Sequence, residues 1–161
     1  MPPFQKFTSK AREVIRKSHE LAIERGQSHV GHAHLLAALL LQDESMVISV
    51  LERLGADIVL MTDAIIESLE LPDPSSVLSP SYQIYITPEL AKILEASTQM
   101  AGKMGDEFVS TEHLFLAILE VPTPSKDLLA RFKVTNDVVM NVIEGLRDST
   151  TSDMPVKPTY R

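Results

Sequence analysis

The chain has 161 residues, of which 44% are hydrophobic, and this composition is typical of one folded globular domain. Its net charge of −7 argues against nucleic acid as the main partner, because phosphate contacts need a basic surface. The absence of cysteine excludes disulfides and favours a reducing, cytoplasmic setting, and the longest apolar run, Leu35 to Leu41, is too short to span a membrane.

Helical periodicity dominates the first half of the chain. Between Phe7 and Ala22 the apolar residues recur with the i, i+3, i+4, i+7 spacing of one helix face. Thr8 stands before this pattern as the expected N-cap, and Gly26 follows it as the expected stop. Asp57 is a second candidate N-cap. The sequence predicts three more helices in this half, at about 32–41, 46–54 and 58–69.

A connector is predicted at residues 70–85. It contains three prolines and four serines, and proline cannot continue a helix. Within it, the segment 82–86 is predicted to be extended. The helical pattern then begins again at Thr87-Pro88, a cap followed by proline at the first helical position.

The second half repeats the first. A shift of 79 positions lays residues 7–40 over 86–119 without a gap and gives nine identities, where unrelated sequences would give about two or three. The most informative pairs are Gly26 with Gly105 and His34 with His113. We therefore predict an all-α fold of eight helices, built as two pseudo-symmetric four-helix repeats at residues 7–69 and 86–146.

Three of the five histidines lie together, at His29, His32 and His34. Only His34 recurs in the second repeat, as His113, in the first turn of an apolar helix where its ring can bond a backbone group. A metal site in the first repeat is the alternative, although no nearby cysteine or carboxylate completes the ligand set. No nucleophile triad, acid pair or glycine-rich phosphate loop is present, so the sequence does not indicate an enzyme.

The repeated motifs resemble a known domain. The start Phe7-Thr8-Ser9-Lys10-Ala11, the two glycine stops and the His-Leu helix openings are similar to the double Clp N-terminal domain of the Clp/Hsp100 AAA+ chaperones. The segment 106–114, DEFVSTEHL, is an especially close match. Ala33 stands where ClpC-like relatives, which recognise phosphoarginine, carry a glutamate in the first repeat. The resemblance therefore favours the ClpB type over the ClpC type.

The resemblance implies a client-binding site. Residues linked to client binding in ClpB-like proteins match Thr8, Asp106 and Glu112, although each of these can also serve as a cap, a loop residue or a charge at a helix N-terminus. The apolar part of the site is predicted from helix periodicity. It consists of Leu94, Met100 and Met104, and flexible thioethers suit a surface that accepts many sequences.

The expected function is that of a substrate-recognition domain. It binds unfolded or aggregated polypeptides and delivers them to the AAA+ ring of a protein disaggregase; the alternatives are an adaptor-docking domain of a ClpC-like protease and a histidine-based metal-binding protein. No cofactor is expected in this chain, whereas ATP and magnesium are implied for a longer parent. The chain is expected to be monomeric and the parent hexameric. Residues 1–147 are expected to form the domain and 148–161 a flexible linker towards an ATPase module.

Overall fold

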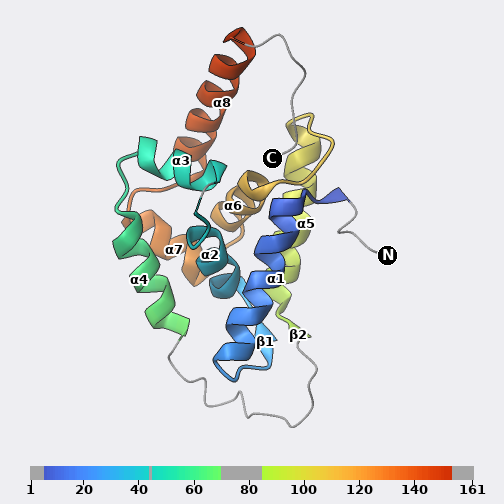
Figure 1. Ribbon diagram of the computed structural model, residues 1–161, viewed down its shortest axis with the longest axis vertical. Helices are drawn as coiled ribbons and strands as arrows, with labels where there is room; N and C mark the ends of the chain where they lie inside the picture. Colours follow the sequence, from blue (N-terminus) through green and yellow to red (C-terminus); the bar gives the residue numbers. More distant parts are fainter. Residues whose placement is uncertain (1–5, 44, 70–84, 154–161) are drawn as a thin grey trace.

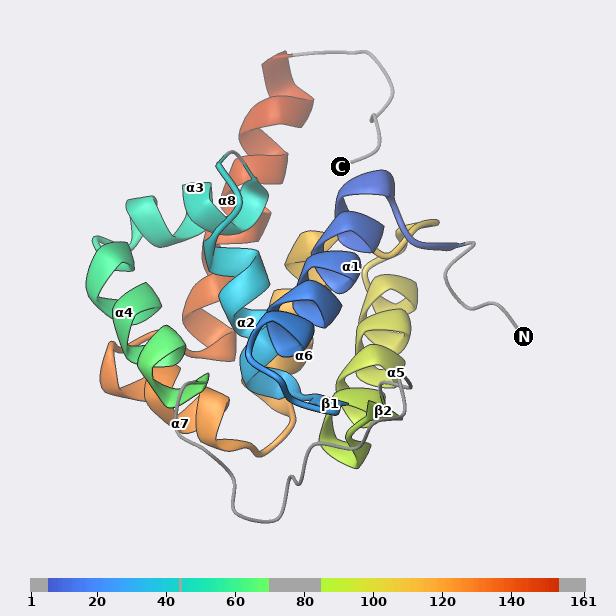
Figure 2. The same ribbon diagram turned by 60° about the horizontal axis from the view of Figure 1, so that its bottom comes forward.

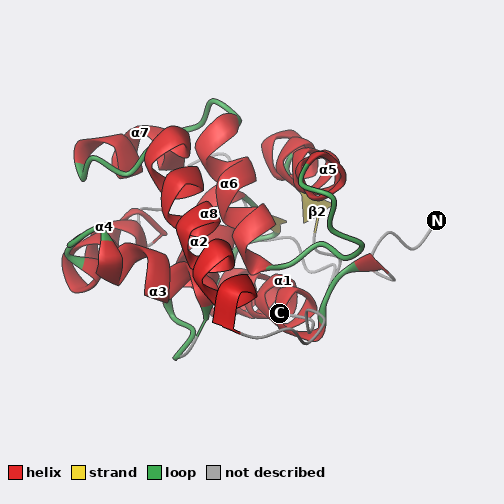
Figure 3. Cartoon of the chain, turned by 90° about the horizontal axis from the view of Figure 1, so that it is seen from above, coloured by secondary structure: helices red, strands yellow, loops and turns green. Residues whose placement is uncertain are grey.

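The computed structural model describes residues 6–43, 45–69 and 85–153, and within these ranges it confirms the all-α prediction with eight helices. The first four are α1 (Ser9–Glu24), α2 (His32–Leu40), α3 (Met46–Arg53) and α4 (Ile58–Leu69). The second four are α5 (Pro88–Lys103), α6 (Thr111–Glu120), α7 (Pro124–Arg131) and α8 (Asn136–Asp153). Two short strands, β1 (His29–Val30) and β2 (Tyr85–Ile86), complete the described structure (Figures 1 and 3).

The helices α2 and α6 form the centre of the molecule, and the other helices lie around them (Figures 1 and 2). Their interior positions are apolar on all sides, which is the pattern of a fully buried helix. In α6 the run from Leu114 to Leu119 is no more than 2% exposed at any position. The surrounding helices are amphipathic, and α1 packs mainly against α2 as α5 packs against α6. The core therefore belongs to both repeats.

Reciprocal backbone pairing joins the two repeats. Val30 of the first repeat pairs in parallel with Ile86 at the start of the second. In the opposite sense, Val109 of the second repeat pairs in parallel with Phe7 at the start of the first. These residues correspond under the shift of 79 positions seen in the sequence, so the duplication is preserved in space. Neither half has a complete set of these backbone partners without the other.

The connector prediction at 70–85 falls almost entirely outside the described residues; only Tyr85 is seen, in β2. The helix α8 continues to Asp153, beyond the expected linker start at residue 148. The first proline after Arg147 is Pro155, so nothing in the intervening sequence prevents helical continuation. In Figure 1 the last turns of α8 extend beyond the other helices.

No helix within the described ranges is both long and apolar enough to cross a membrane.

Candidate functional site

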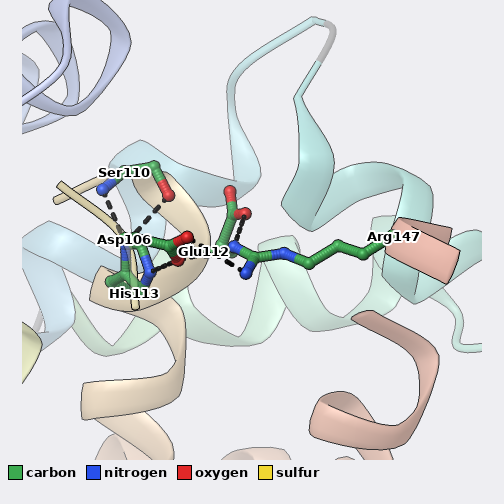
Figure 4. Close-up of polar contacts among 5 residues, drawn as sticks. All are labelled: Asp106, Ser110, Glu112, His113 and Arg147. Carbon is green, nitrogen blue, oxygen red and sulfur yellow. Dashed lines mark hydrogen bonds and ion pairs between the residues drawn. The ribbon is translucent and has the colours of Figure 1, made fainter. Parts of the chain in front are cut away.

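A cluster of charged side chains joins the α5–α6 loop to α8. Arg147 of α8 donates two hydrogen bonds to the Asp106 carboxylate, from Nη1 to Oδ1 at 3.2 Å and from Nη2 to Oδ2 at 2.8 Å. The same Nη2 donates to Oε2 of Glu112 at 3.0 Å. Figure 4 shows the long Arg147 side chain reaching across to both acids. Asp106, Glu112 and Arg147 are called the acid–arginine cluster below.

The turn that ends α5 places Asp106 in this cluster. Gly105 has a φ of +75°, a conformation that glycine adopts without a steric penalty. The backbone N–H of Asp106 then bonds the carbonyl of Ala101 at 2.9 Å. Glu112 comes next in the chain, in the first turn of α6. The glycine stop read from the sequence therefore has a structural consequence, because the turn directs Asp106 towards α8.

His113 is a further hydrogen-bond partner of Asp106. Its Nδ1 accepts the backbone N–H of Ser110 at 2.8 Å, so its other nitrogen, Nε2, carries the proton and donates to Oδ2 of Asp106 at 2.7 Å. Burial lowers the pKa of His113, against the opposing hydrogen bond to Asp106 and the nearby charge of Glu112. The predicted structural role of this histidine, a bond from its ring to a backbone group, is confirmed.

The electrostatics of the cluster favour the ionised forms of Asp106 and Arg147. Burial by itself raises the pKa of Asp106, but the hydrogen bonds from Arg147 and His113 outweigh it and lower that pKa. Burial opposes the charge of Arg147, and the hydrogen bonds to both acids nevertheless raise its pKa. Glu112 is only 1% exposed, so its carboxylate depends on the arginine for charge compensation.

The first repeat lacks this charged cluster. Gln27 stands at the position of Asp106 and Ala33 at that of Glu112. After the third helices, where the positive-φ residues Gly55 and Lys133 correspond, the shift is 78, so Leu69 in α4 corresponds to Arg147 in α8. Gln27 bonds His34 Nε2 at 2.6 Å and donates to the carbonyl of Leu69 at 3.0 Å. The duplicated frame is therefore the same, but a neutral contact in one repeat has become an ion pair in the other.

Thr8 lies at the start of α1, beside the α5–α6 loop that carries Asp106. Its Oγ1 accepts the backbone N–H of Ala11 at 3.1 Å, and its own backbone N–H bonds the carbonyl of Val109 at 2.9 Å. The side chain is buried, with 7% of the residue exposed. The N-cap prediction is confirmed; a contact between Thr8 and a client stays a prediction.

The repeat supplies a matched pair for Thr8. Thr87 caps α5 in the same way, accepting the N–H of Leu90 at 3.1 Å. We expect Thr8→Ala and Thr87→Ala each to lower the free energy of unfolding by about 0.5–2 kcal/mol, measured by urea denaturation, because each removes one cap. Only Thr8→Ala is expected to weaken client binding as well. Equal binding losses in the two variants would assign the effect of Thr8→Ala to the cap alone.

The three predicted apolar residues are buried or half-buried in the structure. Met100 is 8% exposed and belongs to the hydrophobic core, on a helix that packs mainly against α6. Leu94 and Met104 are half-buried and pack against that core. Met104 is also the C-cap of α5, two residues before Asp106. A direct client contact by Leu94, Met100 or Met104 stays a prediction.

The histidines of the first repeat point to different partners. His32 Nδ1 lies 2.6 Å from Oγ of Ser125 in α7, and His34 binds Gln27 and the backbone N–H of Gly31. The ring of His29 lies against Tyr85 of β2, with 5.9 Å between ring centroids. Among the described residues no three metal-ligating side chains converge. The geometry therefore gives no support to the metal-binding alternative.

A second surface feature lies between α1 and the end of α2. It is a depression of about 600 Å³ with charged residues of both signs along its α1 side. Its lining comprises Lys10, Glu13, Val14, Arg16, Lys17, Glu20, Ala38, Leu41, Gln42 and Asp43. None of these residues belongs to the predicted client site.

Arg147 is the site residue that sequence reasoning missed. The signal was present in the repeat, because beyond the third helix the second repeat is one residue shorter and a shift of 78 places Arg147 opposite Leu69, where a charge replaces an apolar residue. A single arginine at the end of an otherwise ordinary helical pattern does not stand out without that comparison. Only the fold shows that it reaches Asp106, which lies 41 positions earlier in the chain.

Comparison with known proteins agrees with this architecture. Residues 6–148 match the family described as Clp repeat (R) N-terminal domain. The chaperone protein ClpB of Propionibacterium freudenreichii is 35% identical over 134 residues, which cover 81% of this chain and 15% of that protein. The ClpB of Bacteroides thetaiotaomicron is 32% identical over 147 residues, covering 89% of this chain and 16% of that protein. The chain thus spans a small part of these relatives.

Solved structures show the same fold. The N-terminal domain of Hsp104 from Candida albicans superposes with a TM-score of 0.76 at 21% identity, covering 88% of this chain and 91% of that one. The ClpV N-domain in complex with a VipB peptide superposes with a TM-score of 0.65 at 18% identity, covering 81% of each chain. With the match of 143 residues to the family profile, from 6 to 148, the chain belongs to the Clp repeat (R) N-terminal domain family.

Proposed function

We propose that this domain binds exposed segments of unfolded or aggregated polypeptides and delivers them to the AAA+ ring of a cytoplasmic, hexameric parent chaperone. The observation that carries the proposal is the acid–arginine cluster. It holds two carboxylates at one end of the bundle, and the Asp106 side chain is 23% exposed. Carboxylates bind backbone N–H groups and basic side chains through charge-assisted hydrogen bonds.

The relatives support this proposal. Those described above are named chaperone protein ClpB, and a domain of the same fold from ClpV was solved with a peptide. ATP and magnesium belong to the proposed parent and not to this chain, which contains no GxxxxGK[ST] loop. Docking of a folded adaptor protein is the remaining alternative, and it predicts tight, saturable binding to one folded partner and little affinity for denatured chains.

The proposal is tested with a permanently unfolded protein, reduced and carboxymethylated α-lactalbumin carrying a fluorophore. Binding to this chain is followed by fluorescence anisotropy, and native α-lactalbumin is the folded comparison. We expect Asp106→Asn to weaken binding of the unfolded protein about tenfold, since a charge-assisted hydrogen bond is worth roughly 1.5 kcal/mol or more.

The matched control is Glu107→Gln, which removes the same charge from the neighbouring, exposed position. We expect this variant to bind as the unsubstituted 161-residue chain does, which is called the parent chain from here on. Equal losses in both variants would reduce the effect to net charge, and unchanged binding by Asp106→Asn would place the site elsewhere. If the parent chain itself does not bind the unfolded protein, the proposed function is wrong.

A further inference from the structure

The two acids proposed to bind clients are already occupied by a group of this chain. Arg147 makes three hydrogen bonds to them, two to Asp106 and one to Glu112. A planar guanidinium on two oxygens of one carboxylate is the strongest common geometry for such a pair. What the structure shows at this site is therefore a filled guanidinium-binding position.

The occupant lies near the C-terminal end of α8. Within the described residues α4 reaches Leu69, the position that corresponds to Arg147, and α8 reaches Asp153. The last turns of α8 extend beyond the other helices (Figure 1), and Arg147 lies six positions before the end of α8 at Asp153. Its ion pairs with Asp106 of the α5–α6 loop and Glu112 of α6 hold this part of α8 against the domain.

The cluster is also partly open to solvent. The side chains of Asp106 and Arg147 are 23% and 20% exposed, whereas Glu112 beneath them is 1% exposed. An incoming cationic side chain can thus reach Asp106 first, and it gains Glu112 only when Arg147 leaves. Displacement replaces one guanidinium with another, so the buried carboxylate is never left without a counter-charge, which would be costly.

We infer that Arg147 is an intramolecular competitor for the client site, displaced by an arginine side chain of a client, and that its displacement frees the last turns of α8. The inference rests on the proposed role of Asp106 and Glu112 in client binding. The site recognises a guanidinium group, and the segment that responds to its binding is residues 147–153. Client binding is thereby linked to the helix end nearest the C-terminus of the chain.

The test uses two labelled Gly/Ser peptides that differ in one central residue, arginine or its neutral isostere citrulline. We expect Arg147→Met to bind the arginine peptide about tenfold more tightly than the parent does, because removal of a bound competitor restores the intrinsic affinity. The citrulline peptide is expected to bind weakly to both chains. The control Arg131→Met removes an exposed arginine of α7 and is expected to leave binding unchanged.

A second measurement does not depend on the folding of a variant. Amide hydrogen exchange of the parent chain is followed with and without saturating arginine peptide. Exchange in residues 147–153 is expected to become faster with the arginine peptide and to stay unchanged with the citrulline peptide. Unchanged exchange with the arginine peptide, or a folded Arg147→Met chain that binds it no more tightly than the parent, would overturn the inference.

These outcomes are separable from the fate of the proposed function. If the parent binds unfolded α-lactalbumin while the arginine peptide leaves α8 unchanged, client binding stands and competition by Arg147 is wrong. If the peptide displaces α8 while no unfolded protein binds, the guanidinium site stands and the client-binding role is wrong.

Discussion

Leu116→Ala is expected to lower the free energy of unfolding by about 2–5 kcal/mol. Leu116 lies on α6, has no exposed surface and belongs to the single hydrophobic core shared by both repeats. Removing its side chain loses apolar burial and leaves a cavity in a helix that is surrounded on every side. Urea denaturation followed by circular dichroism measures the loss as a shift in midpoint.

The matched control is Leu60→Ala on α4, where the leucine is 54% exposed. Its expected effect is about 0.5 kcal/mol or less, since little burial is lost at such a site. A single transition that moves as a whole is expected for Leu116→Ala, because α2 and α6 pack together at the centre. Two separate transitions, or equal effects of the two substitutions, would contradict the shared core.

Acidification from pH 7 to pH 4 is expected to destabilise the domain through its buried histidines. Burial, reinforced by the positive charges of Arg25, His32 and His19, lowers the pKa of His34 from 6.5 to about 4. Below pH 6.5 the unfolded chain takes up a proton that the folded chain refuses, so stability falls as the pH approaches 4. At roughly 1.4 kcal/mol per pKa unit, His34 contributes a loss of about 3 kcal/mol.

The geometry explains why the folded state refuses the proton. Nδ1 of His34 accepts the N–H of Gly31, and Nε2 donates to Gln27, so protonation would place a second hydrogen against a donor. His113 is held in the same way, and its pKa is also lowered by burial, so it adds to the loss in the same direction. Asp106 adds little to the loss between pH 7 and pH 4. Its lowered pKa makes the folded state less stable on acidification, in the same direction, but only at still lower pH.

The measurement is the free energy of unfolding of the parent, His34→Gln and His29→Gln at several values between pH 7 and pH 4. The parent and His29→Gln, whose imidazole is exposed, are expected to share one pH dependence. His34→Gln is expected to lose about 3 kcal/mol less than the parent over that interval, whatever its stability at pH 7. Parallel curves for all three chains would show that His34 does not carry the effect.

The sequence by itself determined the helices, their caps and the duplication. Periodic apolar residues, Thr8 and Thr87 as caps and the glycine stops are local signals, because each depends on residues within a few positions along the chain. The recurrence of His34 as His113 even separated the structural histidines from the others. The membership of the family followed from the same motifs.

Only the tertiary structure decided what these residues touch. The reciprocal pairing of Val30 with Ile86 and of Val109 with Phe7 joins segments that are far apart in the chain, and no local pattern encodes it. Periodicity showed that Met100 lies on an apolar helix face but not that α6 covers that face. The partnership of Arg147 with Asp106 is decided by the path of α8 across the α5–α6 loop, a long-range contact that charge and spacing in the sequence do not specify.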